Sequence, residues 1–226
     1  MTGSPAPSLN QLFADLHAYR VKTMDKEDLQ INIDQRALLE DAADRSAFVQ
    51  PGQTVPPFSL PEVHGGVVEL DQLLATGPVV LVFFRFEGCP ACNIALPHYQ
   101  QELYPSLRDL GATLVAVSPQ VPEKLVAVKD RFDLEFPVVT DVDNWLARSF
   151  GIVFTSSDAS QAHARAKGSD LGETLGTGKW ELPMPTVVVI DQQRVVRFAD
   201  VHPDWLIRTE APVVIDAVRE LVPVSA

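Results

Sequence analysis

The only two cysteines of this 226-residue chain, Cys89 and Cys92, form a Cys-X-X-Cys motif directly after an apolar run. Residues 79–84 read VVLVFF, a continuous apolar block typical of a strand that is buried on both faces. Pro90 follows the first cysteine, and proline fits the first position of a helix, where its missing N–H is not needed. The motif is therefore predicted to lie where a buried strand is followed directly by a helix.

That position favours a reactive thiol. The unpaired N–H groups at the start of a helix stabilise a thiolate, and Arg85 is close enough in sequence to add positive charge. A free cysteine with a pKa of about 8.5 is roughly 3% thiolate at pH 7, and lowering the pKa to about 7 makes half of it thiolate. We expect Cys89 to be the nucleophile and Cys92, one helical turn on, the resolving thiol. A strand-end Arg85 that simply reaches solvent is an equal alternative.

Composition narrows the class of protein. A hydrophobic content of 46% is enough for one substantial core with extensions, and a formal net charge of −12 argues against nucleic-acid or anionic-membrane partners. We found no run of about eighteen uncharged apolar residues, so a cytoplasmic protein without a membrane span is expected. In a reducing compartment a Cys-X-X-Cys pair is catalytic or metal-binding rather than structural. Zinc needs further ligands, and His98 falls on another helical face, so neither a metal nor a cofactor is expected.

The chain is predicted to divide into an N-terminal helical extension, residues 1–50, and a main domain, residues 51–226. Ser8 and Gln11 have the spacing of a capping box for a first helix, and a second helix is expected at residues 35–48. The two helices could pack on the main domain or on a second subunit, and the second alternative would make the protein a homodimer.

Strand and helix patterns alternate after the motif, which indicates an α/β fold with a partly parallel sheet. The expected elements are a helix at 91–109, a strand at 112–118, a helix at 122–132, a strand at 138–140, a helix at 144–150, a hairpin of strands at 186–190 and 195–198, and a helix at 212–221. Residues 155–181 are rich in Ser, Thr, Gly and Ala and too long for an ordinary connection. This insertion is predicted to be a functional lid or disordered.

Three features together resemble the thioredoxin fold: the dithiol after a buried strand, Pro97 in the following helix, and Met184, Pro185 and Thr186 before a late strand. The resemblance covers about residues 55–222. It implies a central mixed sheet flanked by helices. It also implies that Pro185 is in the cis form and that its loop faces the dithiol and receives the substrate.

Four further segments are similar to the peroxiredoxin branch, the alkyl hydroperoxide reductase and thiol-specific antioxidant family; they read TVPPFSLPEVHGGVVELDQLL, LVAVSPQ, FPVVTDVDNWLARSFGI and TVVVIDQQRVVRF. Aligning the family's Pro-X-X-X-Thr-X-X-Cys cysteine with Cys92 puts Arg85 at the proline and Cys89 at the threonine. The arginine that the family carries would align near Met184, where this chain has no arginine. The chain therefore departs from the usual pattern. It resembles a peroxiredoxin body that carries a thioredoxin-style dithiol.

This resemblance implies a thiol-dependent oxidoreductase that reduces peroxides through a Cys89–Cys92 disulfide cycle. An external thiol, either thioredoxin-like or of low molecular weight, would restore the pair. A disulfide reductase without useful peroxidase activity and a non-enzymatic redox sensor are the alternatives.

One tryptophan and one polar and aromatic group are further candidates for the site. Trp180, next to the Met184 loop, is a candidate for a site wall. The polar and aromatic group of His202, Asp204, Trp205 and Arg208 is expected to be ordinary surface, with a pocket or a dimer contact as the alternative.

Overall fold

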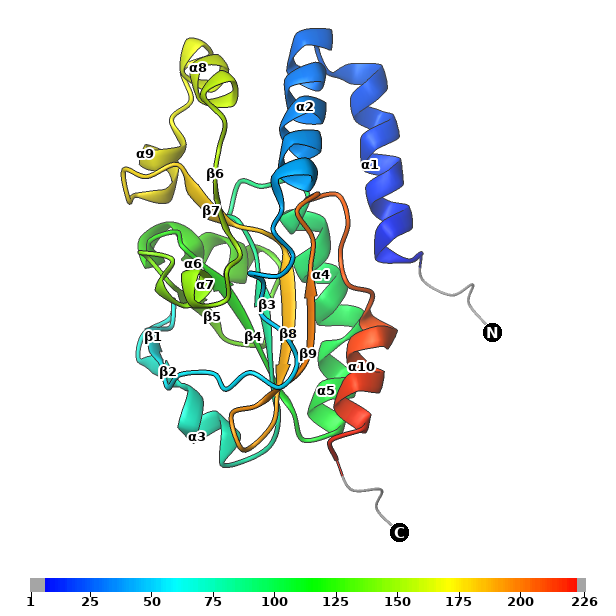
Figure 1. Cartoon of the computed structure of the whole chain (residues 1–226), viewed down its shortest axis with the longest axis vertical. Helices are drawn as coiled ribbons and strands as arrows, with labels where there is room; N and C mark the ends of the chain where they lie inside the picture. The colour runs from blue at the N-terminus through cyan, green and yellow to red at the C-terminus, as the bar shows by residue number, and fades with distance from the viewer. Residues whose placement is uncertain (1–6, 223–226) are drawn as a thin grey trace.

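A five-stranded mixed sheet with the order β5-β4-β3-β8-β9 forms the centre of the computed structural model, which describes residues 7–222 (Figure 1). The sheet contains β3 (Val79–Phe83), β4 (Thr113–Ser118), β5 (Val138–Thr140), β8 (Thr186–Ile190) and β9 (Val196–Val201). The middle strand, β3, runs parallel to β4 and antiparallel to β8, and β8 and β9 form the predicted hairpin. The α/β fold with a central mixed sheet is therefore confirmed.

The apolar run of β3 supports two separate cores, one on each face of the sheet. Val80 and Val82 contribute to the core beneath α4, α5, α6 and α10, whereas Val79, Leu81 and Phe83 contribute to the core beneath α3 and α7. Because successive side chains of a strand point to opposite faces, a strand between two cores must be apolar at every position. The covering helices are α3 (Leu70–Leu74), α4 (Cys92–Glu102), α5 (Tyr104–Asp109), α6 (Pro122–Arg131), α7 (Trp145–Ser149) and α10 (Ala211–Arg219). A small hairpin of β1 (Ser59–Pro61) and β2 (Val67–Glu69) precedes α3.

The single helix predicted at 91–109 is in fact two helices, α4 and α5. Leu103 separates them, and Pro105 lies in the first turn of α5, where a proline is tolerated. In residues 7–222 no helix is long and apolar enough to cross a membrane.

The N-terminal extension forms a helical pair, α1 (Leu9–Thr23) and α2 (Lys26–Ala42), beside the sheet (Figure 1). The Ser8 side chain caps α1 by accepting from Gln11 N at 3.1 Å, while the Gln11 side chain binds Asp15 rather than completing a capping box. The prediction of a second helix at 35–48 is wrong at both ends: Asp25 caps the start of α2 by accepting from Glu27 N at 2.8 Å, and α2 ends at Ala42.

The extension packs on the main domain of its own chain. Leu9 of α1 is fully buried in the core beneath α4, and Phe13 is almost so. Glu210, just before α10, accepts hydrogen bonds from Leu9 N at 3.0 Å and from Asn10 N at 2.9 Å. A negative carboxylate at the start of a helix satisfies unpaired N–H groups and stabilises the helix. The first helix is therefore attached to the loop that precedes the last one.

Residues 155–181 form a folded arm rather than a structureless loop. The arm is enclosed by the antiparallel strands β6 (Val153–Thr155) and β7 (Glu181–Pro183), and it carries α8 (Asp158–Ala166) and α9 (Leu171–Leu175). Its first helix, α8, packs against α2, where Gln35 Oε1 accepts hydrogen bonds from Ser157 N at 2.8 Å and from Ser160 Oγ at 2.9 Å. The extension and the insertion thus support each other.

Gly151 provides a test of how the extension is attached to the main domain. Its φ is +69°, and a Cβ atom there would lie 2.1 Å from the carbonyl oxygen of Ala47. Gly168 has a similar φ of +74° but nothing within 4 Å of the same position. We expect Gly168→Ala to cost about 1–2 kcal/mol of unfolding free energy from the left-handed backbone alone. Gly151→Ala should cost about 1–3 kcal/mol more because of the clash. Denaturant unfolding of the two variants measures this, and equal losses would contradict the close approach.

Candidate active site

The Cys-X-X-Cys motif follows β3 and begins α4, as the sequence predicts. The two cysteines are free thiols and are fully buried. Regular helix begins at Cys92, slightly later than expected, but Asn93 N already donates to the Cys89 carbonyl at 3.0 Å across the exposed Pro90. Cys92 N donates to Cys89 Sγ at 3.4 Å. The first cysteine therefore receives one of the unpaired N–H groups of the helix start.

The two sulfurs differ in their electrostatic surroundings. Burial alone would raise the pKa of Cys89, but a hydrogen bond from the Cys92 thiol, the charges of Arg85 and Arg208, and the Cys92 N–H together hold that pKa well below its ordinary value. Burial, the hydrogen bond to Cys89 and the negative charge on Cys89 raise the pKa of Cys92 well above its ordinary value. The surroundings therefore favour the thiolate form at Cys89 and the thiol form at Cys92.

Arg85 connects the end of β3 with the dithiol. Its backbone N–H points to Cys92 Sγ at 3.5 Å, and its carbonyl accepts from Ser118 Oγ at 3.0 Å. The guanidinium lies 4.7 Å from the centre of the Trp205 ring and 5.6 Å from that of Phe86. Stacking of this kind holds the charge close to the site. Arg85 does not simply extend into solvent.

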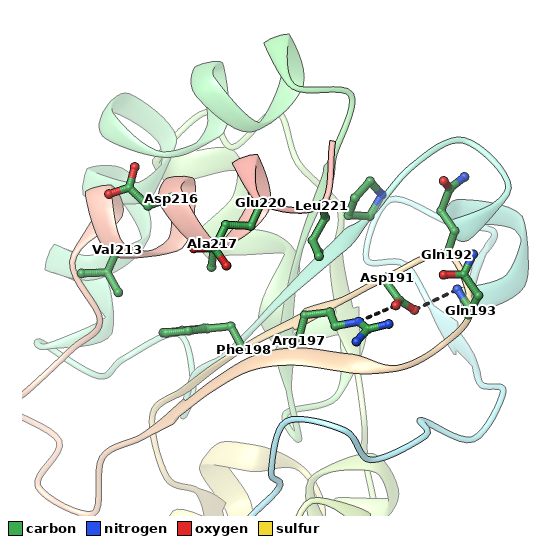
Figure 2. A pocket seen from close by; sticks show the side chains of 11 residues that line it. Asp191, Gln192, Gln193, Arg197, Phe198, Val213, Asp216, Ala217, Glu220 and Leu221 are labelled. Atoms are coloured by element: carbon green, nitrogen blue, oxygen red, sulfur yellow. Dashed lines mark hydrogen bonds and ion pairs between the residues drawn. The ribbon is translucent and has the colours of Figure 1, made fainter. Parts of the chain in front are cut away.

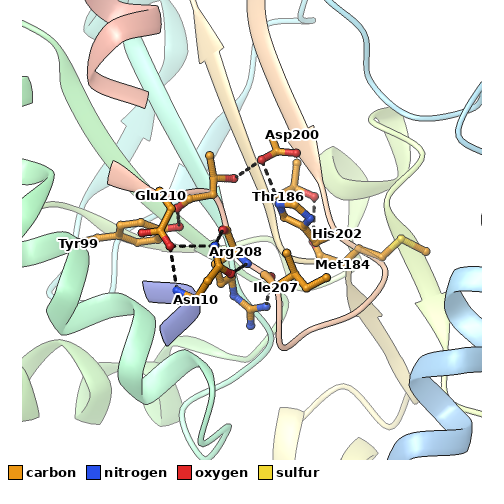
Figure 3. A network of polar contacts seen from close by, with 10 residues as sticks. Asn10, Tyr99, Met184, Thr186, Asp200, His202, Ile207, Arg208 and Glu210 are labelled. Carbon is orange, nitrogen blue, oxygen red and sulfur yellow. Dashed lines mark hydrogen bonds and ion pairs between the residues drawn. The ribbon is translucent and has the colours of Figure 1, made fainter. Parts of the chain in front are cut away.

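A polar network around the loop that follows β9 carries a second arginine (Figure 3). Arg208 is only 6% exposed; its Nη1 donates to the Trp205 and Ile207 carbonyls, and its guanidinium lies 5.3 Å from the centre of the Phe13 ring. Asn10 and Glu210 tie the same loop to α1. The expectation of ordinary surface is therefore wrong for Trp205, which is buried and contacts Arg85, and for Arg208, which Phe13 of α1 covers.

The same network includes Asp200, His202 and Thr209. His202 and Thr209 both contact Asp200 Oδ2, at 2.9 and 3.0 Å, and Tyr99 Oη, from α4, donates to the Thr209 carbonyl at 2.8 Å. The helix that begins with Cys92 is thereby bonded to the loop that carries Arg208.

The loop of Met184, Pro185 and Thr186 lies at the same edge of the sheet as the dithiol, because Thr186 pairs with Phe83 at the end of β3. The predicted cis form of Pro185 is wrong: no cis peptide bond occurs among residues 7–222. The chain passes directly from β7 into β8, with Met184 N bonded to the Ile152 carbonyl at 2.7 Å, so no tight turn requires a cis bond. All three residues are buried.

A cavity of about 260 Å³ opens beside Arg85. Its walls come from Arg85 and Phe86, from Trp205, from α2 and from the arm of residues 155–181, including Trp180. The expectation that Trp180 forms a wall of a site is consistent with this position. The arm therefore forms a wall of the cavity beside Arg85, and its role as a lid stays a prediction.

A larger cavity, of about 740 Å³, lies at the opposite end of the sheet (Figure 2). It is lined by α10 and by the β8–β9 turn, where Asp191 accepts from Arg197 Nε at 2.6 Å and from Gln193 N at 2.9 Å. Pro78, which precedes β3, lines this cavity, whereas the cysteines follow β3. The strand's five residues separate the two by roughly 17 Å. The larger cavity is therefore not the thiol site.

Several residues of the site were missed from the sequence. Gln120 Oε1 accepts from Glu87 N at 2.8 Å and its Nε2 donates to the Thr174 carbonyl at 2.8 Å, so it joins the motif loop to the arm. Ser118 ends β4, which is parallel to β3, and Gln120 follows it. Because the carboxyl ends of parallel strands meet at one edge of a sheet, this position could have predicted that both residues lie near the motif. Arg20, on α1, also lies within electrostatic reach of Cys89 and Arg85, and the sequence carries no signal for it.

The sheet order, the dithiol at the end of β3 and the covering helices define a thioredoxin-like protein. Residues 51–199 match the AhpC/TSA family, and the chain belongs to that family. Its dithiol departs from the Pro-X-X-X-Thr-X-X-Cys pattern, since Arg85 and Cys89 occupy the proline and threonine positions.

Relatives that match this chain include a thiol-disulfide oxidoreductase and a putative peroxiredoxin. The thiol-disulfide oxidoreductase ResA of Halalkalibacterium halodurans is 34% identical over 113 residues, 49% of this chain and 61% of the relative, so the match spans less than two thirds of that protein. A putative peroxiredoxin of Mycobacterium tuberculosis is 29% identical over 107 residues, 47% of this chain and 67% of the relative.

Solved structures support the fold. The crystal structure of peroxidoxin BcpB from Mycobacterium tuberculosis has a TM-score of 0.61 at 22% identity, covering 77% of this chain and 99% of that one. AhpC from Enterococcus faecalis has a TM-score of 0.58 at 15% identity, covering 75% of this chain and 90% of that one. The helical extension before residue 51 lies outside the family match.

Proposed function

We propose that this protein is a thiol-dependent oxidoreductase that reduces peroxides by cycling Cys89 and Cys92 between dithiol and disulfide. The observation that carries the proposal is the geometry of the pair at the end of β3: two buried free thiols one helical turn apart, with Cys92 N donating to Cys89 Sγ at 3.4 Å. The charges of Arg85 and Arg208 lower the pKa of Cys89, whereas burial and the charge on Cys89 raise that of Cys92. A thiolate is the nucleophilic form of cysteine, and a neighbouring thiol is what resolves its oxidised product.

The reaction follows from these roles. The Cys89 thiolate attacks one peroxide oxygen, the O–O bond breaks, and the other oxygen leaves as an alcohol or as water after taking up a proton; Cys89 becomes a sulfenic acid. The Cys92 sulfur then attacks the Cys89 sulfur, and the sulfenic oxygen leaves as water with the Cys92 proton. An external thiol, thioredoxin-like or of low molecular weight, reduces the resulting disulfide by thiol exchange.

Arg85 has a supporting role in this scheme. Its guanidinium lies beside the thiolate, where the family's usual arginine would stabilise thiolate and peroxide. Pro90 starts the helix that positions Cys92, and Met184, Pro185 and Thr186 are proposed to form the substrate-facing loop once the site opens. Because both cysteines are fully buried beneath α1 and the loop around Arg208, part of this cover must move before a substrate reaches Cys89.

A disulfide reductase is the second candidate, supported by the relatives named thiol-disulfide oxidoreductase and by the Cys-X-X-Cys spacing. In that case Cys89 attacks a substrate disulfide, forms a mixed disulfide and is released by Cys92. A redox sensor would use the same reversible pair without turnover. A cytoplasmic location and a homodimer stay predictions.

Stopped-flow oxidation with stoichiometric hydrogen peroxide tests the proposal. We expect the reduced protein to be oxidised much faster than free cysteine at the same pH, with formation of an intramolecular disulfide. A rate no better than that of free cysteine would reject the peroxidase proposal, and turnover with a disulfide substrate would then separate a reductase from a sensor.

A further inference from the structure

The cavity beside Arg85 lies between the N-terminal extension and the main domain. One wall is α2, which precedes residue 51 and so lies outside the family match, and another is the arm of residues 155–181, which lies within it. At about 260 Å³ it is a little smaller than the ~300–1,000 Å³ typical of sites for drug-sized ligands. Its size suits a small organic molecule.

Two residues that line this cavity each carry a buried hydrogen-bond donor without a partner. Gln35 is only 6% exposed, and its Oε1 accepts from Ser157 N, a group that can only donate, so the free end of the side chain is the Nε2 amine. Gln35 Nε2 and Arg85 Nε are both buried and unpaired among the residues that the structure describes. Buried donors without partners are costly, so a ligand with acceptor oxygens would be stabilised here.

The charges around the cavity favour an anion. In a chain with a net charge of −12, no Asp or Glu side chain is found among the described residues that line it. The nearby acids are neutralised: Asp28 is bound by His163 and Lys167, and Asp204 lies 3.5 Å from Arg36. Arg85 is thus a positive charge in the wall that no lining acid neutralises, and the charge it faces on its other side is the Cys89 thiolate.

The remaining lining is mainly apolar, with Phe154, Trp180, Leu182 and Trp205 among its residues. A ligand that matches both the donors of Gln35 and Arg85 and this apolar lining has a carboxylate at one end and a small apolar body at the other. An arginine and an amide donor suit the two oxygens of a carboxylate, since charge-assisted hydrogen bonds to a carboxylate are the stronger kind.

We propose that this cavity binds the carboxylate of a small apolar organic acid that reacts with the dithiol, either a carboxylated hydroperoxide or a carboxylated low-molecular-weight thiol. The link to the chemistry is Arg85, whose side chain lines the cavity and whose backbone N–H lies 3.5 Å from Cys92 Sγ. The reaction rests on the proposed function, but the binding does not.

Binding is tested on the reduced protein with an unreactive probe, phenylacetate, and its neutral analogue phenylacetamide. Trp180 and Trp205, two of the three tryptophans, line the cavity, so intrinsic fluorescence reports occupancy. We expect phenylacetate to bind saturably and at least about tenfold more tightly than phenylacetamide, which corresponds to about 1.4 kcal/mol. Equal affinity for the two probes in the wild-type protein would overturn the proposal whatever the enzymatic activity is.

Gln35→Glu is the matched variant, because it keeps the acceptor for Ser157 N and Ser160 Oγ but replaces the free amine by a negative charge. Its phenylacetate affinity should fall at least about tenfold, while Gln101→Glu, the same change at an exposed position, should leave it unchanged. An unchanged affinity in a Gln35→Glu protein with wild-type circular dichroism would also overturn the proposal.

The kinetics of Gln35→Glu identify the source of the carboxylate. If the ligand is the oxidant, the variant slows oxidation by a carboxylated hydroperoxide but not by hydrogen peroxide. If the ligand is the reductant, it slows reduction of the disulfide by mercaptoacetate but not by 2-mercaptoethanol. Either result supports the proposal. If the variant changes the rates with both oxidants equally and the rates with both reductants equally, the carboxylate has no role in the reaction and the proposal is rejected.

Discussion

Replacing Cys89 with serine is expected to reduce both peroxide reduction and disulfide reduction to the uncatalysed rate. The serine hydroxyl stays protonated in the pH range where the Cys89 thiolate forms, so no nucleophile remains at this position. Cys92→Ser should retain the first chemical step and stop at the sulfenic acid or the mixed disulfide, because the resolving thiol is missing. Single-turnover kinetics with mass spectrometry of the trapped product distinguish the two variants.

The opposite result has a definite meaning. If Cys92→Ser were inactive and Cys89→Ser trapped the sulfenic acid, Cys92 would be the peroxidatic residue. That assignment follows from aligning the family's single motif cysteine with Cys92. It disagrees with the electrostatics of the structure, in which the negative charge on Cys89 and burial both raise the pKa of Cys92.

Arg85→Gln is expected to raise the pKa of Cys89, because a nearby positive charge favours the thiolate and the substitution removes it. The rate constant for thiolate attack should also fall, since the charge next to the reacting sulfur is lost. Ultraviolet absorbance of the thiolate as a function of pH measures the pKa. Arg85→Lys should restore most of the pKa but not the stacking on Trp205.

Arg219→Gln is the matched control for this change. Arg219 is exposed on α10 and pairs with Asp216, so the substitution removes the same charge far from the dithiol. The pKa of Cys89 should be unchanged in this variant. Equal shifts in Arg85→Gln and Arg219→Gln would show that net charge, rather than the position of Arg85, determines the pKa.

The strand before the motif was predictable because it lies between two cores and every one of its side chains is buried. A strand that separates two cores must be apolar throughout, and a Cys-X-X-Cys motif with Pro90 after such a strand indicates a strand, a turn and a helix. The hairpin of β8 and β9 was predictable for a similar reason, since two apolar strands flank a polar turn that begins at Asp191.

The parts that were not predictable depend on contacts between distant segments. Residues 155–181 have the composition of a disordered linker, yet they fold because α2 provides a surface, with Gln35 bonded to Ser157 and Ser160. Arg208 has the sequence context of a surface residue and is buried only because α1 covers it. Pro185 carried the resemblance to a cis-proline loop, but the straight path from β7 to β8 keeps it trans.

The central claim is that Cys89, and not Cys92, is the thiolate of the pair. The most direct test is the rate of alkylation of each cysteine by iodoacetamide between pH 7 and pH 9, resolved by peptide mass spectrometry. Because its pKa is lowered, Cys89 should be alkylated first and at a nearly constant rate, whereas a free cysteine with a pKa of about 8.5 slows roughly 25-fold from pH 9 to pH 7. Faster alkylation of Cys92, or a Cys89 rate that falls like that of a free cysteine, would contradict the account.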